Sequence, residues 1–67
     1  MEVIVNNTAK EIEENSPLFD LLNDLNMTEQ KGIAIALNNK VVTKSKWAAT
    51  TLSNNDKITI IKATQGG

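Results

Sequence analysis

The chain has 67 residues with neither cysteine nor histidine, which excludes disulfides, thiolate metal sites, most zinc sites and the usual acyl-transfer triads within it. Its eight acidic residues and seven lysines give a net charge of −1; the lysines are spread along the sequence, so the basic footprint of a nucleic-acid-binding protein is missing. No apolar run approaches the roughly 20 residues that span a membrane, and no secretory signal is visible, so we expect a cytoplasmic protein. Because cysteine and histidine are missing, we also expect that the chain is not itself an enzyme.

A strand and a tight turn are expected first. In residues 1–7, Val3 and Val5 share one face and Ile4 takes the other, and such β-branched residues favour strands. The Asn-Asn pair at 6–7 suits a hairpin turn, because asparagine tolerates positive φ better than most residues.

A second strand and a helix are expected next. Residues 8–13 form the more polar strand, with Ile12 pointing inward. Ser16 then caps a helix and Pro17 fits its first turn, while Asn26 ends it. One apolar stripe follows the spacing i, i+3, i+4 and i+7: Leu18, Leu21, Leu22 and Leu25.

The remaining strands alternate between two faces. Residues 33–37 place Ile33, Ile35 and Leu37 on one face and two alanines, Ala34 and Ala36, on the other. A second Asn-Asn turn at 38–39 leads into a short strand at Val41 and Val42.

An irregular segment then precedes the last strand. Trp47 and Leu52 anchor the segment, with one helical turn. In the last strand, residues 57–64, Ile58 and Ile60 point inward and Ile61 points outward.

This order of elements predicts an α+β protein in which one helix covers one face of a small mixed sheet. It is the pattern of the β-grasp, or ubiquitin-like, fold, whose first and last strands lie parallel in mid-sheet. We expect residues 1–67 to form a single domain, with residues 64–67 as an extended reactive tail. The inward-pointing side chains are Val3, Val5, Ile12, Leu18, Leu21, Leu22, Leu25, Ile33, Ile35, Leu37, Val42, Trp47, Leu52, Ile58 and Ile60.

The outer face of the sheet is a candidate docking surface. Ile4 and Ile61 are expected to be neighbours there, with Ala34, Ala36 and Ala63 nearby, and an apolar patch on an uncovered face can mark an interaction site. The alternative is that these are ordinary isolated apolar residues.

The two terminal glycines suggest that the end of the chain is the reactive group. Gly66 and Gly67 carry no side chains and accept nearly any φ. From Thr64 onward, four residues extend at most about 14 Å, long and thin enough to thread a channel in a partner enzyme. Adenylation by ATP would turn the poorly electrophilic carboxylate into a mixed anhydride, from which an isopeptide bond or a thiocarboxylate could form.

The sequence resembles the ThiS family of sulfur carriers in thiamine (thiazole) biosynthesis over essentially its whole length. The matching stretches are "VIVNN", "LFDLLNDL", "IAIALNNKVV" and "KWAATTLSNNDKITIIKATQGG", the last being the most specific. The resemblance implies that a ubiquitin-activating-like adenylyltransferase adenylates Gly67, that a sulfur donor system converts it to a thiocarboxylate, and that the sulfur passes to thiazole synthase. No cofactor would be bound by this chain, because ATP is used by the activating partner.

Candidate partner-binding residues follow from the tail and the outer face: Ile4, Ala34, Ala36, Ile61, Ala63, Thr64 and Gln65. Other readings remain open. The small subunit of molybdopterin synthase has the same kind of terminus, although "WA" at Trp47 and the absence of prolines near the end favour the thiazole branch. A ubiquitin-like protein modifier and a pure binding module are further alternatives. Three carboxylates, Glu11, Glu13 and Glu14, are interpreted as a solvated edge.

Overall fold

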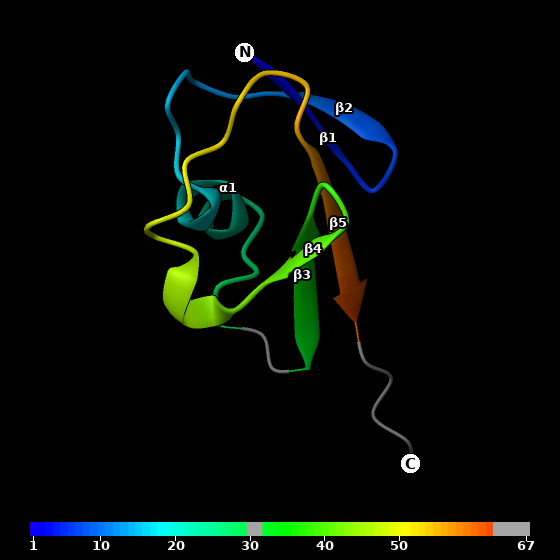
Figure 1. Cartoon of the computed structure of the whole chain (residues 1–67), viewed down its shortest axis with the longest axis vertical. Helices are drawn as coiled ribbons and strands as arrows, with labels where there is room; N and C mark the ends of the chain where they lie inside the picture. Colours follow the sequence, from blue (N-terminus) through cyan, green and yellow to red (C-terminus); the bar gives the residue numbers. More distant parts are fainter. Residues whose placement is uncertain (30–31, 63–67) are drawn as a thin grey trace.

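The elements form in the order that the sequence predicts (Figure 1). The computed structural model describes residues 1–29 and 32–62, and within them five strands, one α-helix and one short 3₁₀ turn. Their bounds are β1 Glu2–Val5, β2 Thr8–Glu11, α1 Leu18–Asp24, β3 Ile33–Leu37, β4 Lys40–Val42, the 3₁₀ turn Lys44–Lys46 and β5 Lys57–Lys62. The last strand was expected to reach residue 64; residues 63 and 64 lie outside the described part.

The strands build one mixed sheet in the order β2-β1-β5-β3-β4. β1 and β5 are parallel at its centre, and the other neighbouring strands are antiparallel. Figure 1 shows α1 beside one face of this sheet. The predicted β-grasp architecture, with the first and last strands adjacent in mid-sheet, is therefore confirmed.

Both hairpin turns consist of two asparagines in the left-handed region. The φ angles are 48° and 67° at Asn6 and Asn7, and 49° and 71° at Asn38 and Asn39. Val5 pairs with Thr8 across the first turn, so the loop has two residues. Two-residue loops with positive φ at both positions match the right-handed twist of the strands. Both predicted turns are confirmed.

The start of α1 differs from the prediction. The Ser16 hydroxyl does not cap the helix; it donates to the carbonyl oxygen of Glu13 at 2.7 Å. The helix begins after Pro17, which is the N-cap residue and makes no side-chain cap bond. Backbone carbonyls of the distant irregular segment act instead, because the N–H groups of Leu18 and Phe19 donate to Thr50 and Trp47 at 2.7 and 3.1 Å. These bonds satisfy donors that have no partner within a helix.

The core lies between α1 and the sheet. Its buried side chains are Val3, Leu18, Leu21, Leu22, Ile35, Trp47, Leu52 and Ile58, and the other seven predicted inward residues pack against them. Met1 and Met27 join this outer layer, which the sequence reading did not anticipate. The Trp47 indole N–H donates to the Val42 carbonyl at 3.0 Å, so this large side chain is buried with its polar atom satisfied. Both anchors of the irregular segment, Trp47 and Leu52, are confirmed.

Candidate functional site

β5 is the element that leads to the predicted tail. It lies between β1 and β3, and its last residue, Lys62, pairs with Ile33 at the start of β3. Residues 63–67 therefore follow directly from a central strand of the sheet. Five predicted site residues lie outside the described part of the chain: Ala63, Thr64, Gln65, Gly66 and Gly67.

An exposed apolar surface lies on the outer face at this end of β5. Ile61 is 54% exposed and pairs with Ala34, which is also exposed. Ala36, two residues after Ala34 on β3, is half-buried. Its partner on β4 is Val41, which is 73% exposed. We call Ile61, Ala34, Ala36 and Val41 the Ile61 surface. Four side chains from three adjacent strands thus form a continuous apolar area.

Ile4 does not belong to this surface, and its predicted contact with Ile61 is wrong. The parallel register places Ile4 opposite Lys57, whereas Ile61 lies four residues later on β5. At ~3.3 Å per residue, this is a separation of about 13 Å along the strand. Ile4 lies on the outer face as predicted, but its neighbour on β2 is Ala9.

Val41 is the surface residue that the sequence reading did not assign to the site. The signal was available, because Val42 was expected to point inward and successive strand residues alternate between faces. Val41 must then share the outer face with Ala34 and Ala36.

An open pocket of about 570 Å³ adjoins the Ile61 surface and shares Ala34 and Val41 with it. Its floor is largely apolar, with Ile33, Val42 and Trp47 among the lining residues, and Lys44 and Glu29 at its margin. In the described ranges, no group of three or more acidic, His or Cys side chains could hold a metal ion. This arrangement offers apolar contact area to another molecule.

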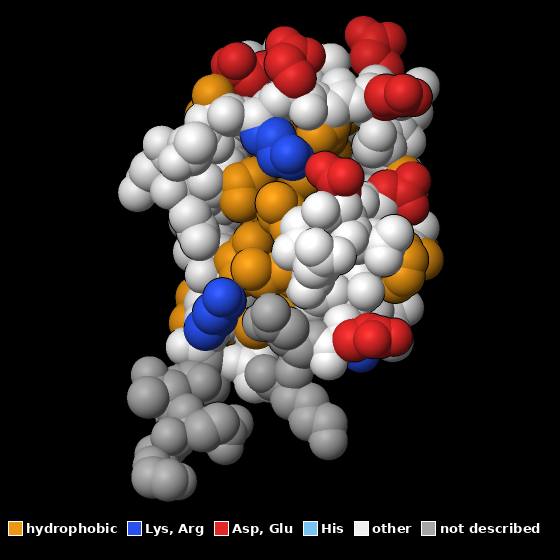
Figure 2. All heavy atoms as spheres, turned by 180° about the vertical axis from the view of Figure 1, so that it is seen from behind, with side chains coloured by type: hydrophobic (Ala, Val, Ile, Leu, Met, Phe, Trp, Pro, Cys, Tyr) orange, Lys and Arg blue, Asp and Glu red, His pale blue; other side chains and the backbone are white. Residues whose placement is uncertain are grey.

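The two parts of the chain carry opposite charge. Residues 1–29 hold seven of the eight acidic residues and one lysine, whereas residues 30–67 hold six lysines and one aspartate. Figure 2 shows most of the acidic side chains on one face gathered in its upper part, away from the lower end, where β5 ends in Figure 1. Two exposed lysines, Lys57 and Lys62, mark the two ends of β5.

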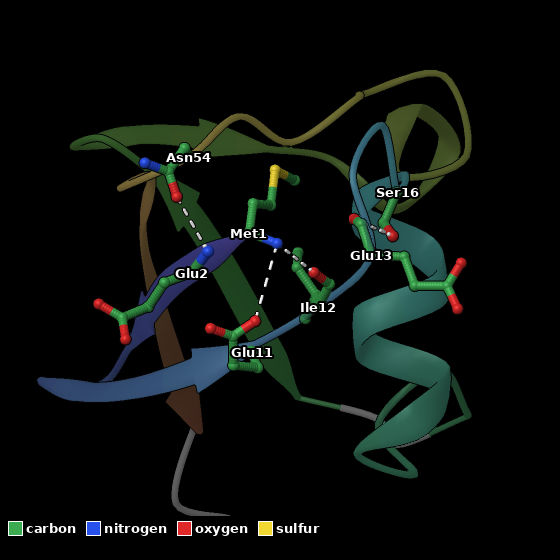
Figure 3. A network of polar contacts seen from close by, with 7 residues as sticks. All are labelled: Met1, Glu2, Glu11, Ile12, Glu13, Ser16 and Asn54. Atoms are coloured by element: carbon green, nitrogen blue, oxygen red, sulfur yellow. Dashed lines mark hydrogen bonds and ion pairs between the residues drawn. The ribbon is translucent and has the colours of Figure 1, made fainter.

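The first two residues are held by polar contacts at the opposite end of the molecule (Figure 3). The Met1 ammonium group donates to the Ile12 carbonyl at 2.7 Å and lies 3.8 Å from the Glu11 carboxylate. The Glu2 backbone N–H donates to the Asn54 side chain at 2.9 Å. The side chains of Glu11, Glu13 and Glu14 are exposed here, which agrees with the interpretation of these carboxylates as a solvated edge.

The sequence and the fold of this chain were each found to be similar to those of known proteins. The family model described as "ThiS family" matches residues 3–67. The chain is 27% identical to the sulfur carrier protein ThiS of Escherichia coli (strain K12) over the full length of both chains. A crystal structure of a thiamine biosynthesis protein (ThiS) from Geobacter metallireducens aligns over the full length of both chains with a TM-score of 0.84 at 23% identity. An NMR structure of a thiamine biosynthesis protein from the same organism gives a TM-score of 0.77 at 23% identity, covering all of this chain and 88% of the other.

Proposed function

Because this chain belongs to the ThiS family, we propose that it carries sulfur for thiazole formation in thiamine biosynthesis. The observation that carries the proposal is the family match itself, which runs from β1 through Gly66 and Gly67. The full-length relative in Escherichia coli bears the name of a sulfur carrier. The protein is then a co-substrate of partner enzymes rather than an enzyme, and it works in the cytoplasm.

The reactive group is the carboxylate of Gly67. One of its oxygens attacks the α-phosphorus of ATP on an adenylyltransferase of the ubiquitin-activating type, and pyrophosphate leaves. A sulfur nucleophile at the oxidation level of sulfide then displaces AMP, which leaves a thiocarboxylate on Gly67. Thiazole synthase receives the sulfur. The partners supply the ATP site and the catalytic groups, and Gly66 lets the end enter a narrow site because it has no side chain.

The Ile61 surface is the proposed docking area for these partners. Its position supports this role, since Ile61 is separated from Ala63 by a single residue and therefore lies next to where the predicted tail begins. A partner can bury this surface without ordering long side chains. Two of its four residues are alanines, which lose no rotamer freedom on burial. Thr64 and Gln65 would contact the partner along the channel that receives Gly67.

The test is reconstitution followed by intact-mass spectrometry. The purified chain is incubated with the activating enzyme of its own host, ATP and a sulfide source. We expect the mass to rise by the difference between sulfur and oxygen. A variant lacking Gly66 and Gly67 is the control, and it should keep its circular dichroism spectrum while losing the mass change. Absence of the mass change in the full-length chain, with an enzyme that charges another carrier, would overturn the proposal.

The same reaction separates the alternatives. A protein modifier forms higher-mass conjugates visible as ladders on gels, whereas a carrier remains a single species. Offering the thiocarboxylate to thiazole synthase and to the large subunit of molybdopterin synthase then identifies the branch. Sulfur transfer to the molybdopterin enzyme alone would assign the chain to that pathway and contradict the thiazole assignment.

A further inference from the structure

Asn6 lies directly after the last residue of β1 that pairs with β5. β1 ends at Val5, which pairs with Ile58, and the chain then turns back into β2. β5 continues for four more residues, to Lys62. Its side toward β1 would therefore lose its hydrogen-bond partners just before the residues that lead to Gly67.

The side chain of Asn6 takes over where the backbone of β1 ends. Its backbone N–H donates to the Ile58 carbonyl at 3.0 Å. The side-chain oxygen Oδ1 then accepts from the Ile60 N–H at 2.8 Å, and Nδ2 donates to the Ile60 carbonyl at 3.4 Å. The carboxamide thus binds both polar backbone groups of Ile60, which in a longer parallel ladder would bind two different residues of β1.

A second asparagine holds the opposite end of β5 in a similar way. Asn38, the first residue of the other hairpin turn, donates its N–H to the Lys57 carbonyl at 2.8 Å. Its Oδ1 accepts from the Lys57 N–H at 2.9 Å. Both turns need an asparagine or glycine for positive φ, yet glycine would supply only the backbone angle. The asparagine side chain adds a hydrogen bond to β5 that glycine cannot make. Asn6 makes it from the side of β1, and Asn38 makes it from the side of β3.

We infer that Asn6 is a positioning residue for sulfur transfer: its carboxamide holds Ile60 and so fixes the direction in which β5 delivers the chain at Lys62. This inference rests on the proposed function for its effect on transfer, but the contact itself is independent of that function. A partner that binds the residues after Lys62 must otherwise order the end of β5 as well, and this ordering costs conformational entropy.

The experiment compares Asn6→Gly with two matched variants. Asn6→Gly keeps positive φ accessible and removes the carboxamide. Asn38→Gly removes the corresponding group at the far end of β5. Asn7→Gly changes the neighbouring turn residue, whose side chain makes no hydrogen bond in the described part of the chain. All three are measured by residue-resolved hydrogen exchange and by steady-state charging with the activating enzyme.

Asn6→Gly should speed exchange of the Ile60 amide about fivefold, the equivalent of one hydrogen bond, and Asn38→Gly should do the same for Lys57 only. Asn6→Gly should also raise KM for the carrier about fivefold at unchanged kcat, whereas the other two variants should not. Asn6→Asp, which keeps the acceptor for the Ile60 N–H, should restore most of the protection.

Two results would overturn the inference: unchanged Ile60 exchange in Asn6→Gly, or an equal rise in KM in Asn6→Gly and Asn38→Gly. Failure of the proposed function looks different, since the wild-type chain would then not be charged, would form conjugates, or would pass its sulfur only to the molybdopterin enzyme. The exchange data on the free protein would in that case still decide whether Asn6 holds the end of β5.

Discussion

The two faces of the sheet use alternate residues of the same strands for different purposes. On β5, Ile58 is fully buried beneath α1, while Ile61 is 54% exposed on the opposite face. The inner face carries large side chains in contact with the helix, whereas the outer face near the end of β5 carries small or exposed apolar ones. Inner residues should therefore control stability, and outer residues should control association.

The largest expected effect is the loss of a core side chain. Leu22→Ala removes a side chain with no solvent exposure from the centre of the inner layer, and should lower the free energy of unfolding by about 3 kcal/mol. Urea denaturation followed by tryptophan fluorescence measures this. Val41→Ala on the outer face is the control and should change stability by less than about 0.5 kcal/mol. Equal losses in both variants would remove the distinction between the faces.

A charge on the Ile61 surface should weaken partner binding while the protein stays folded. Ile61→Asp places a carboxylate where an apolar contact is proposed, and should reduce affinity for the activating enzyme by about 2 kcal/mol. Calorimetric titration measures it. Ala9→Asp puts the same charge on the outer face of β2, away from the Ile61 surface, and should bind like the wild type. If both variants bind normally, docking takes place elsewhere.

The Trp47 hydrogen bond should contribute a smaller amount. Trp47→Phe removes the indole donor to the Val42 carbonyl and should cost about 1–2 kcal/mol of unfolding free energy, since an acceptor loses its partner. Chemical denaturation followed by circular dichroism measures the change. Phe19→Leu, at a side chain 38% exposed, is the matched aromatic control. A neutral Trp47→Phe variant would show that water replaces the bond without cost.

The smallest effect is expected from a surface ion pair. Lys10 Nζ lies 3.4 Å from Asp24 Oδ2, and the Asp24 side chain is 70% exposed. Asp24→Asn should therefore cost less than about 0.5 kcal/mol, and the difference from wild type should vanish in high salt. Thermal unfolding at low and high ionic strength measures it. A salt-independent loss would indicate that Asp24 acts through something other than this pair.

The face on which each residue lies was predictable, because side-chain periodicity depends only on the local sequence. All fifteen expected inward residues are in the core or pack against it. The stagger between β1 and β5 was not predictable, since a shift of two residues preserves the faces. That is why Ile4 and Ile61 were wrongly paired. The hydrogen-bond acceptors at the start of α1 were also missed, because the carbonyl groups of Thr50 and Trp47 come from a distant part of the chain.

For the proposed docking surface, the sequence predicted Ile4, Ile61, Ala34, Ala36 and Ala63 on one face. The structure separates Ile4 from Ile61 and adds Val41, and Ala63 lies outside the described residues. The role of Asn6 was hidden for a different reason. A turn propensity describes an angle that the residue adopts, whereas the bond to Ile60 joins residues 54 positions apart. Such a contact depends on where the whole sheet places the two strands.

The parallel pairing of β1 with β5 also sets the order of events during synthesis. The middle of the sheet can form only after β5 has been made, because β1 pairs with β5 and the two strands are far apart in the sequence. Contacts of such long sequence separation are formed slowly, since loop closure precedes any gain from them. The two hairpins can form early, but the ribosome must release nearly the whole chain before they are joined. A carrier built this way reaches its native sheet only after its last strand has been made.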